Sequence, residues 1–168
     1  MAAELTSGEA STWRLIQRLS DLANGVVEHQ IRSAADLSSA EFEVLRCLVA
    51  APDRQLRQNE LAALLGWDKS RLSHQLTRMQ HRELLDRQKS GRVHAVEVTR
   101  MGVQKFELAD NAHVAAVRSL LREHLSAAER EALERTAAET AASAAAPVAA
   151  PAPAPPAQAP RRLRPQTG

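Results

Sequence analysis

The side chains expected to face outward between Lys69 and Arg78 are of the kind that binds a polyanion. They supply positive charge and hydrogen-bond donors and include no acid: Lys69, Ser70, Arg71, Ser73, His74, Gln75, Thr77 and Arg78. In the major groove of DNA, Arg pairs with guanine and Gln pairs with adenine, while cationic side chains neutralise phosphates. The segment therefore predicts a DNA-contacting surface, with an ordinary solvated helix as the alternative.

Two short helices joined at Gly66 are expected to position this surface. Apolar residues recur at helical spacing in both segments, at Leu61, Leu64, Leu65, Leu72, Leu76 and Met79. Gly66 tolerates the positive φ of a tight turn between helices, and Asp68 is the expected N-cap of the second helix. The pattern predicts helices at about 58–65 and 69–82, as in a helix-turn-helix whose second helix enters the major groove.

A β-hairpin is expected directly after the second helix. Residues 85–88 form its first strand, and residues 93–98 have the β-propensity of a return strand. The turn between them contains Gly91, which allows positive φ. The hairpin tip is expected to be basic, with Arg87, Lys89 and Arg92. A basic hairpin in this position predicts a winged helix, whose wing reaches the DNA backbone or the minor groove.

Two helices are expected before this lobe. Residues 11–33 carry a wide apolar stripe at helical spacing, which suggests burial against more than one neighbour. Ser38 and Glu41 then form a capping box, which starts a helix that ends before Pro52. The following segment, 52–57, is expected to be a loop with a single strand contact at Leu56.

The chain after the hairpin is expected to be helical and then to lose regular structure. Thr99 is a suitable N-cap for a long helix at about 100–124, and a capping box of Ser126 and Glu129 starts a last helix that ends near 142. Residues 144–168 are rich in Ala and Pro and end in a basic cluster. Such a tail cannot bury a core and is expected to be disordered, either contacting a polyanion or acting as an inert solubilising segment.

Charge is distributed unevenly along the chain. The formal net charge is only +2, but residues 54–105 hold eleven Lys and Arg against five Asp and Glu. Positive charge therefore gathers around the expected DNA-contacting surface. No apolar stretch is long enough for a membrane span, and the acidic N-terminus lacks a signal-peptide core, so we expect a soluble, cytoplasmic protein.

The residues that carry most catalytic and metal chemistry show no suitable spacing. The six histidines contain no metal-binding motif, and no nucleophile elbow, phosphate-binding glycine loop or paired-acid motif is present, so neither an enzyme nor a cofactor is expected. Cys47 is the only cysteine, which rules out a disulfide within the chain. It is expected to be a small packed thiol, with an oxidant sensor as the alternative.

Taken together, the chain resembles the MarR family of bacterial transcriptional regulators over about residues 12–143. Four segments carry the resemblance: 37–45 before the helix-turn-helix, Asn59–Gly66 at its first helix and turn, Lys69–Leu85 at its recognition helix and exit, and Arg92 with Val98–Gly102 at the wing and next helix. The sequence differs from the family pattern at Ser90, where the wing usually has Asp, and at Glu83, where the recognition helix usually exits at Gly.

The resemblance implies a homodimer bound to double-stranded DNA and regulated by a small-molecule effector. The fold class is mainly α with a small β-hairpin wing, and its expected parts are a dimerisation helix (1–35), a winged helix-turn-helix lobe (36–100), C-terminal dimerisation helices (101–143) and the tail (144–168). The predicted DNA contacts are Lys69, Ser70, Arg71, Ser73, His74, Gln75, Arg78, Lys89 and Arg92. The predicted function is a ligand-responsive repressor on a pseudo-palindromic operator. A helical protein–protein adaptor that does not bind DNA is the alternative.

Overall fold

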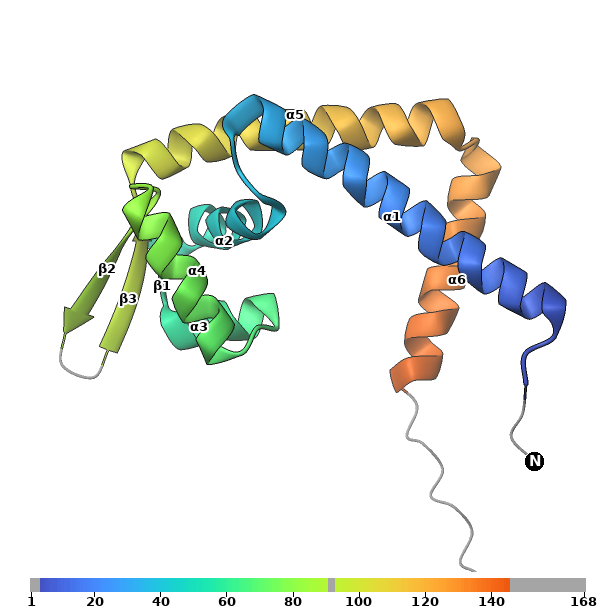
Figure 1. The fold of residues 1–168 in the computed structure, drawn as a ribbon, viewed down its shortest axis with the longest axis horizontal. Coiled ribbons are helices and arrows are strands. Elements are labelled where there is room, and N and C mark those ends of the chain that lie inside the picture. Colours follow the sequence, from blue (N-terminus) through green and yellow to red (C-terminus); the bar gives the residue numbers. More distant parts are fainter. Residues whose placement is uncertain (1–3, 91–92, 146–168) are drawn as a thin grey trace, which may run out of the picture. The chain divides into compact units, whose positions relative to one another are not determined.

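The computed structural model describes residues 4–90 and 93–145, without the side chains of residues 89, 90, 93, 94, 144 and 145. The chain divides into two compact units, Met1–Ser126 and Ala127–Gly168. The predicted disorder of the tail is wrong for residues 144 and 145, which are helical, and the rest of the tail lies outside the described residues. In the first unit, helix α1 packs against α5, and a helical lobe with a three-stranded sheet follows α1 (Figure 1). Within the described ranges, none of the helices combines the length and apolar character that a membrane span requires.

Helix α1 (Ser7–Ala35) begins earlier than the apolar stripe alone indicated. A capping box explains this start, because the Glu9 amide donates to Thr6 Oγ1 at 3.2 Å and the Thr6 amide donates to the Glu9 carboxylate at 2.7 Å. Hydrogen bonds from Thr6 also hold the pKa of the Glu9 carboxyl below its usual value. The helix ends at Asp36, which has φ 54° and whose amide donates to the Arg32 carbonyl.

Helix α2 (Ser39–Ala50) has the predicted capping box, with Ser38 as N-cap and Glu41 at the third position. It is followed by a short 3-10 turn, η1 (Pro52–Arg54), and by strand β1 (Gln55–Arg57). The predicted strand contact of Leu56 is confirmed, because Leu56 pairs with Val96.

Helices α3 (Gln58–Leu65) and α4 (Lys69–His81) form the predicted helix-turn-helix. Gly66 between them has φ 63°, and Asp68 caps α4 by accepting from the Arg71 amide at 2.8 Å. One expectation for α3 is wrong: Leu64 does not face the core but is 65 % exposed, although it follows the fully buried Leu61 by three residues, so the buried face of this short helix is narrower than the apolar spacing indicates.

The sheet has the strand order β1-β3-β2 and is antiparallel throughout. Strands β2 (Leu85–Ser90) and β3 (Val93–Val98) form the predicted hairpin, with Leu85 opposite Val98 and Gln88 opposite Ala95. Strand β2 runs two residues further than expected, and the two residues between the strands lie outside the described residues.

Helix α5 (Arg100–His124) follows the hairpin at the predicted N-cap Thr99, whose Oγ1 accepts from the Gly102 amide at 3.0 Å. Gly102 lies so close to the preceding lobe that a Cβ atom there would approach the Leu84 carbonyl oxygen to 2.0 Å. Helix α6 (Ala127–Ala145) begins directly after Ser126 and belongs to the second unit.

One hydrophobic core joins α2, α3, α4 and the sheet to the end of α1 and to α5. Its largest fully buried side chains are Leu37, Val44, Leu45, Leu48, Leu61, Leu72, Leu76, Met79, Leu84, Leu85 and Val96. Phe42 extends this core toward α5 through its ring stacked on Phe106, with centroids 5.5 Å apart. The core therefore buries one face of α4 and leaves its opposite face exposed.

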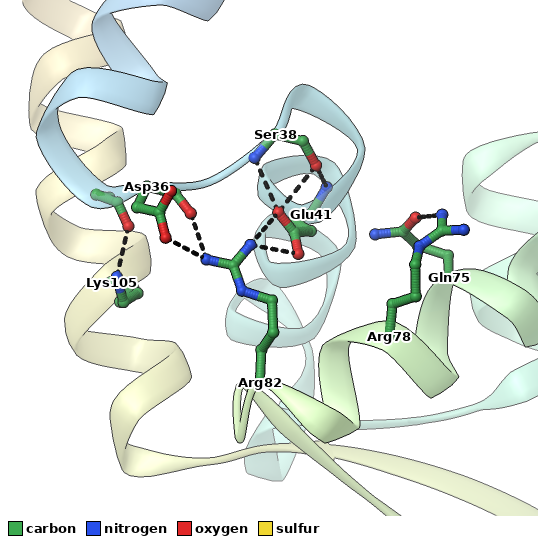
Figure 2. Close-up of polar contacts among 8 residues, drawn as sticks. Asp36, Ser38, Glu41, Gln75, Arg78, Arg82 and Lys105 are labelled. Atoms are coloured by element: carbon green, nitrogen blue, oxygen red, sulfur yellow. Dashed lines mark hydrogen bonds and ion pairs between the residues drawn. The ribbon is translucent and has the colours of Figure 1, made fainter.

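An arginine network ties the end of α4 to the junction of α1 and α2 (Figure 2). The two Arg82 guanidinium nitrogens contact the Glu41 carboxylate at 2.8 and 2.9 Å, the Asp36 carboxylate at 2.7 Å and the Asp36 carbonyl at 2.6 Å. Lys105 of α5 donates to the neighbouring Ala35 carbonyl at 2.8 Å. We call these contacts of Arg82 with Glu41 and Asp36 the Arg82 clamp.

The left-handed exit of α4 stands next to this clamp. Glu83 has φ 57°, its amide donates to the Gln80 carbonyl, and the Leu84 amide donates to the Met79 carbonyl at 3.0 Å. These are the two hydrogen bonds of a Schellman motif, whose left-handed residue is usually Gly. Thr99 Oγ1 also donates to the Glu83 carbonyl at 2.6 Å, so the exit of α4 is joined to the start of α5.

Glu83→Gly is expected to stabilise the protein by about 0.5–1 kcal/mol, because Gly adopts the left-handed conformation without steric strain. Gly66→Ala is the matched control, since its φ is also positive and open space surrounds its Cβ position. It should destabilise by about 1 kcal/mol. Urea unfolding measures both changes. A Glu83→Gly protein that loses as much stability as Gly66→Ala would contradict the strain at Glu83.

Arg82→Met is expected to destabilise the protein by about 2 kcal/mol, because it leaves the Glu41 carboxylate without its cation. The Glu41 side chain is only 7 % exposed, whereas that of Asp36 is 82 % exposed, so the loss should come mainly from Glu41. Arg46→Met is the control, since Arg46 pairs with Glu43 on the exposed face of α2 and should cost below about 1 kcal/mol. Equal losses for the two variants in urea unfolding would refute a structural role for the clamp.

Candidate DNA-binding surface

The outer face of α4 presents most of the predicted contacts to solvent. Between Lys69 and Arg78, six of the polar side chains are exposed: Lys69, Ser70, Arg71, His74, Thr77 and Arg78. On the opposite face, Leu72, Leu76 and Met79 are fully buried in the core. The predicted Ser73 lies at the boundary, half-buried, and its carbonyl accepts from Thr77 Oγ1 at 3.0 Å. The amphipathic pattern of α4 therefore predicted the orientation of the helix correctly.

The expectation that Gln75 faces outward is wrong. Gln75 is only 4 % exposed, because it follows Leu72 and precedes Met79 at helical spacing on the border of the buried face. Its side-chain oxygen accepts a hydrogen bond from Arg78 Nη2, and Figure 2 shows the two side chains meeting on α4. In this arrangement Gln75 orients Arg78 and does not itself present an amide to an adenine.

Arg71 lies over the ring of Trp67, a residue that was not among the predicted site residues. The guanidinium carbon is 4.2 Å from the ring centroid, within the range of a cation–π contact. Trp67 is half-buried, and Arg71 follows it by four residues. The four-residue spacing of Trp67 and Arg71 is the signal in the sequence that could have indicated this contact, because residues four apart at a helix start can meet. The signal is weak, since many pairs with this spacing do not meet.

Arg87 was expected at the hairpin tip and is found within strand β2, opposite Val96. Its Nη1 donates to Thr77 Oγ1 of α4 at 3.2 Å, and its Nη2 donates to Gln58 Oε1 of α3 at 3.1 Å. Arg87 therefore joins the wing to both helices of the helix-turn-helix. No sequence signal predicted this, because the partners are 10 and 29 residues away.

The two predicted wing contacts are not placed by the structure. Strand β2 includes the backbone of Lys89, opposite His94, but the Lys89 side chain lies outside the described residues. Arg92 lies outside them entirely. Both remain predictions, and so does the consequence of Ser90 at the position where the family usually has Asp.

The positive charges of α4 are not neutralised within the part of the chain that the structure describes. No carboxylate there lies within ion-pair distance of Lys69, Arg71 or Arg78, whereas Arg32, Arg46, Arg82 and Arg135 each have an acidic partner. Helix α4 itself contains no acid. Free cations on one exposed helix face are suited to phosphate oxygens and base edges. Among the same residues, no cluster of His, Cys, Asp or Glu could hold a metal ion.

Comparison with known proteins agrees with this geometry. The family model described as MarR family matches residues 35–94, from the end of α1 into β3. No curated protein sequence matches the chain.

Three solved structures share the fold. AbsC, a MarR family transcriptional regulator from Streptomyces coelicolor, is 25 % identical with a TM-score of 0.74, over 85 % of this chain and 98 % of its own. Sco3205 from the same organism, a MarR family regulator in complex with DNA, is 24 % identical with a TM-score of 0.74, over 85 % and 91 % of the two chains. A mutant of MarR from E. coli complexed with operator DNA is 21 % identical with a TM-score of 0.68, over 82 % and 99 %.

The family model covers the helix-turn-helix and the clamp residues, and the structural matches extend the agreement to α1 and α5. The mainly helical fold with a winged helix is thereby confirmed. Residues 35–94 belong to the MarR family of DNA-binding transcriptional regulators, and the described chain has the winged-helix fold of its solved members.

Proposed function

We propose that the chain acts as a homodimer on a pseudo-palindromic operator and represses transcription in a ligand-dependent manner. The observation that carries the proposal is the outer face of α4, where exposed cations stand without acidic partners on a helix fixed by the core. Sco3205 and the E. coli MarR mutant have the same fold and were solved with DNA. Membership of a family of transcriptional regulators confirms the expectation that the chain is not an enzyme.

The proposed DNA contacts come from α4 and from the wing. On α4 they are Lys69, Ser70, Arg71, Ser73, His74 and Arg78, and on the wing they are Lys89 and Arg92. Gln75 is removed from the contacts and assigned to the support of Arg78, because it is buried and already bonded. In a helix-turn-helix, residues near the start of the second helix contact base edges, so Arg71 is the contact we expect to matter most.

A second copy of the chain would explain the exposed apolar side chains of α1. Only Ile31 and Ala35 of this helix are buried, while Trp13, Leu15, Ile16, Leu19, Leu22 and Val26 are 44–64 % exposed. Exposed apolar area of this extent marks an association surface in a soluble protein. We propose that α1 contributes to the dimer interface, together with the C-terminal helices. The dimer would place its two α4 helices about 34 Å apart, one turn of DNA.

The effector site remains a proposal from the family resemblance. A cavity of about 390 Å³ lies between α1 and α5, lined by Val26, Gln30, Ala116, Leu120, Glu123 and others. It lies along the two long helices, whereas the family resemblance implies an effector pocket between the dimer helices and the DNA-binding lobe. We therefore do not assign this cavity to the effector.

Cys47 has the properties of a packed thiol. It is half-buried beside the core, and burial raises the pKa of the thiol above its usual value, outweighing the opposing effect of Arg46. Since the thiolate is the reactive form, a raised pKa lowers the fraction that can react with an oxidant at neutral pH. We propose that regulation does not depend on Cys47.

Arg71→Ala is expected to weaken operator binding by about 1–3 kcal/mol and, where the contact is to phosphate, to reduce the salt slope by about 1. The exposed Arg46 of α2 provides a control with the same change of charge, and Arg46→Ala should bind nearly as the parent does. Gel shifts at several salt concentrations measure both. Undiminished affinity of Arg71→Ala would contradict the assignment of Arg71 as the main contact. A parent protein that binds no DNA would favour the adaptor alternative.

Leu19→Glu is expected to convert the dimer to a monomer, because it places a charge in the apolar face of α1 that the second copy would bury. Leu64→Glu is the control: Leu64 is 65 % exposed and Leu19 is 63 % exposed, but Leu64 lies on α3, outside the proposed interface. Sedimentation equilibrium distinguishes the two states. A parent protein that is monomeric at micromolar concentration would contradict the proposal.

A further inference from the structure

The position of Trp67 is fixed by the turn between α3 and α4. It follows the left-handed Gly66, and its amide donates to the Ala62 carbonyl at 3.0 Å. Its ring is half-buried and packs against the hydrophobic core. Asp68 then caps α4 directly after it. Trp67 is therefore held by its backbone and by its ring before any DNA is present.

Arg71 is held against one face of this ring. It is the third residue of α4, where its amide donates to Asp68 Oδ1, and its guanidinium carbon lies 4.2 Å from the ring centroid. The side chain is exposed, and among the described residues none accepts a hydrogen bond from the guanidinium. Stacking uses the flat face of the guanidinium and leaves its N–H edges free.

We propose that Trp67 is a positioning residue that orients Arg71 for DNA, an inference that rests on the proposed function. Bidentate recognition of a guanine or a phosphate needs the guanidinium plane in one orientation. A long side chain that is free in solution loses rotamer freedom when it is immobilised at an interface. The ring of Trp67 restricts Arg71 beforehand, so less freedom is lost on binding.

Arg78 provides the contrast on the same helix. Its guanidinium donates to Gln75, so one of its N–H groups is already used, and no aromatic ring contacts it among the described residues. Arg78 is thus oriented by a hydrogen bond, whereas Arg71 is oriented by stacking and keeps all its donors. If Trp67 acts through Arg71, a change at Trp67 should alter the effect of removing Arg71 but not that of removing Arg78.

A double-mutant cycle tests this inference on a duplex that the parent protein enriches from a random pool. Trp67→Leu keeps an apolar side chain in the core and removes the ring, while Trp67→Phe keeps a smaller ring. Fluorescence anisotropy should show that Trp67→Leu weakens binding by about two- to fivefold when Arg71 is present, with a smaller loss for Trp67→Phe. The same change should have no effect in the Arg71→Ala background. Urea unfolding shows whether each variant is folded. If Trp67→Leu is not folded, the cycle uses Trp67→Phe alone.

The outcomes separate this inference from the proposed function. Coupling of Trp67 to Arg71 but not to Arg78 supports the positioning role. The positioning role would be overturned if Trp67→Leu weakened binding equally with and without Arg71, because Trp67 would then act only through the fold. This holds even where Arg71→Ala itself weakens binding. The same criterion applies to Trp67→Phe if it replaces Trp67→Leu. If Arg71→Ala binds as the parent does, both the positioning role and the assignment of Arg71 fail.

Discussion

The Arg82 clamp is the constraint on which the placement of the DNA-binding surface depends. Arg82 closes the end of α4, and through it the helix is tied to the buried Glu41 and to the turn at Asp36, 41 and 46 residues earlier in the chain. Glu41 also caps α2 by bonding Ser38, so one carboxylate fixes both the start of α2 and the end of α4. Lys105 ties α5 to the adjacent Ala35 carbonyl. Four helices therefore meet at one small polar cluster beside the core. A shift of α1 or α5 would displace the end of α4 through these contacts.

The outer face of α4 is organised side chain by side chain. Trp67 stacks on Arg71, Gln75 bonds Arg78, and Thr77 receives Arg87 from the wing. None of these contacts removes the positive charge from the surface, since the three partners are neutral. The face is thus charged and partly preorganised, which is the combination that favours binding to a polyanion with little loss of side-chain freedom. After α4, the left-handed Glu83 ends the helix, and the hydrogen bond from Thr99 to its carbonyl joins this end to the start of α5.

The sequence predicted the features that depend on residues close together in the chain. The N-caps Ser38, Asp68 and Thr99 and the left-handed Gly66 were foreseen because each depends on neighbours within four residues. Glu83 was predicted to differ from the family pattern, which has Gly at this position. The structure explains the preference for Gly, because residue 83 has a left-handed backbone conformation. The burial of Gln75, the exposure of Leu64 and the position of Arg87 were not foreseen. They depend on the exact edge of an apolar face or on partners far along the chain, which periodicity alone does not resolve.

In the proposed dimer, two copies of α4 bind one DNA duplex together. Selection of bound duplexes from a random pool tests it most directly, because the enriched sequences report both contact and geometry. A dimer with two α4 helices should enrich an inverted repeat whose half-site centres lie about one helical turn, or a multiple of it, apart. Absence of any enriched sequence, or enrichment of a single unrepeated half-site, would contradict it.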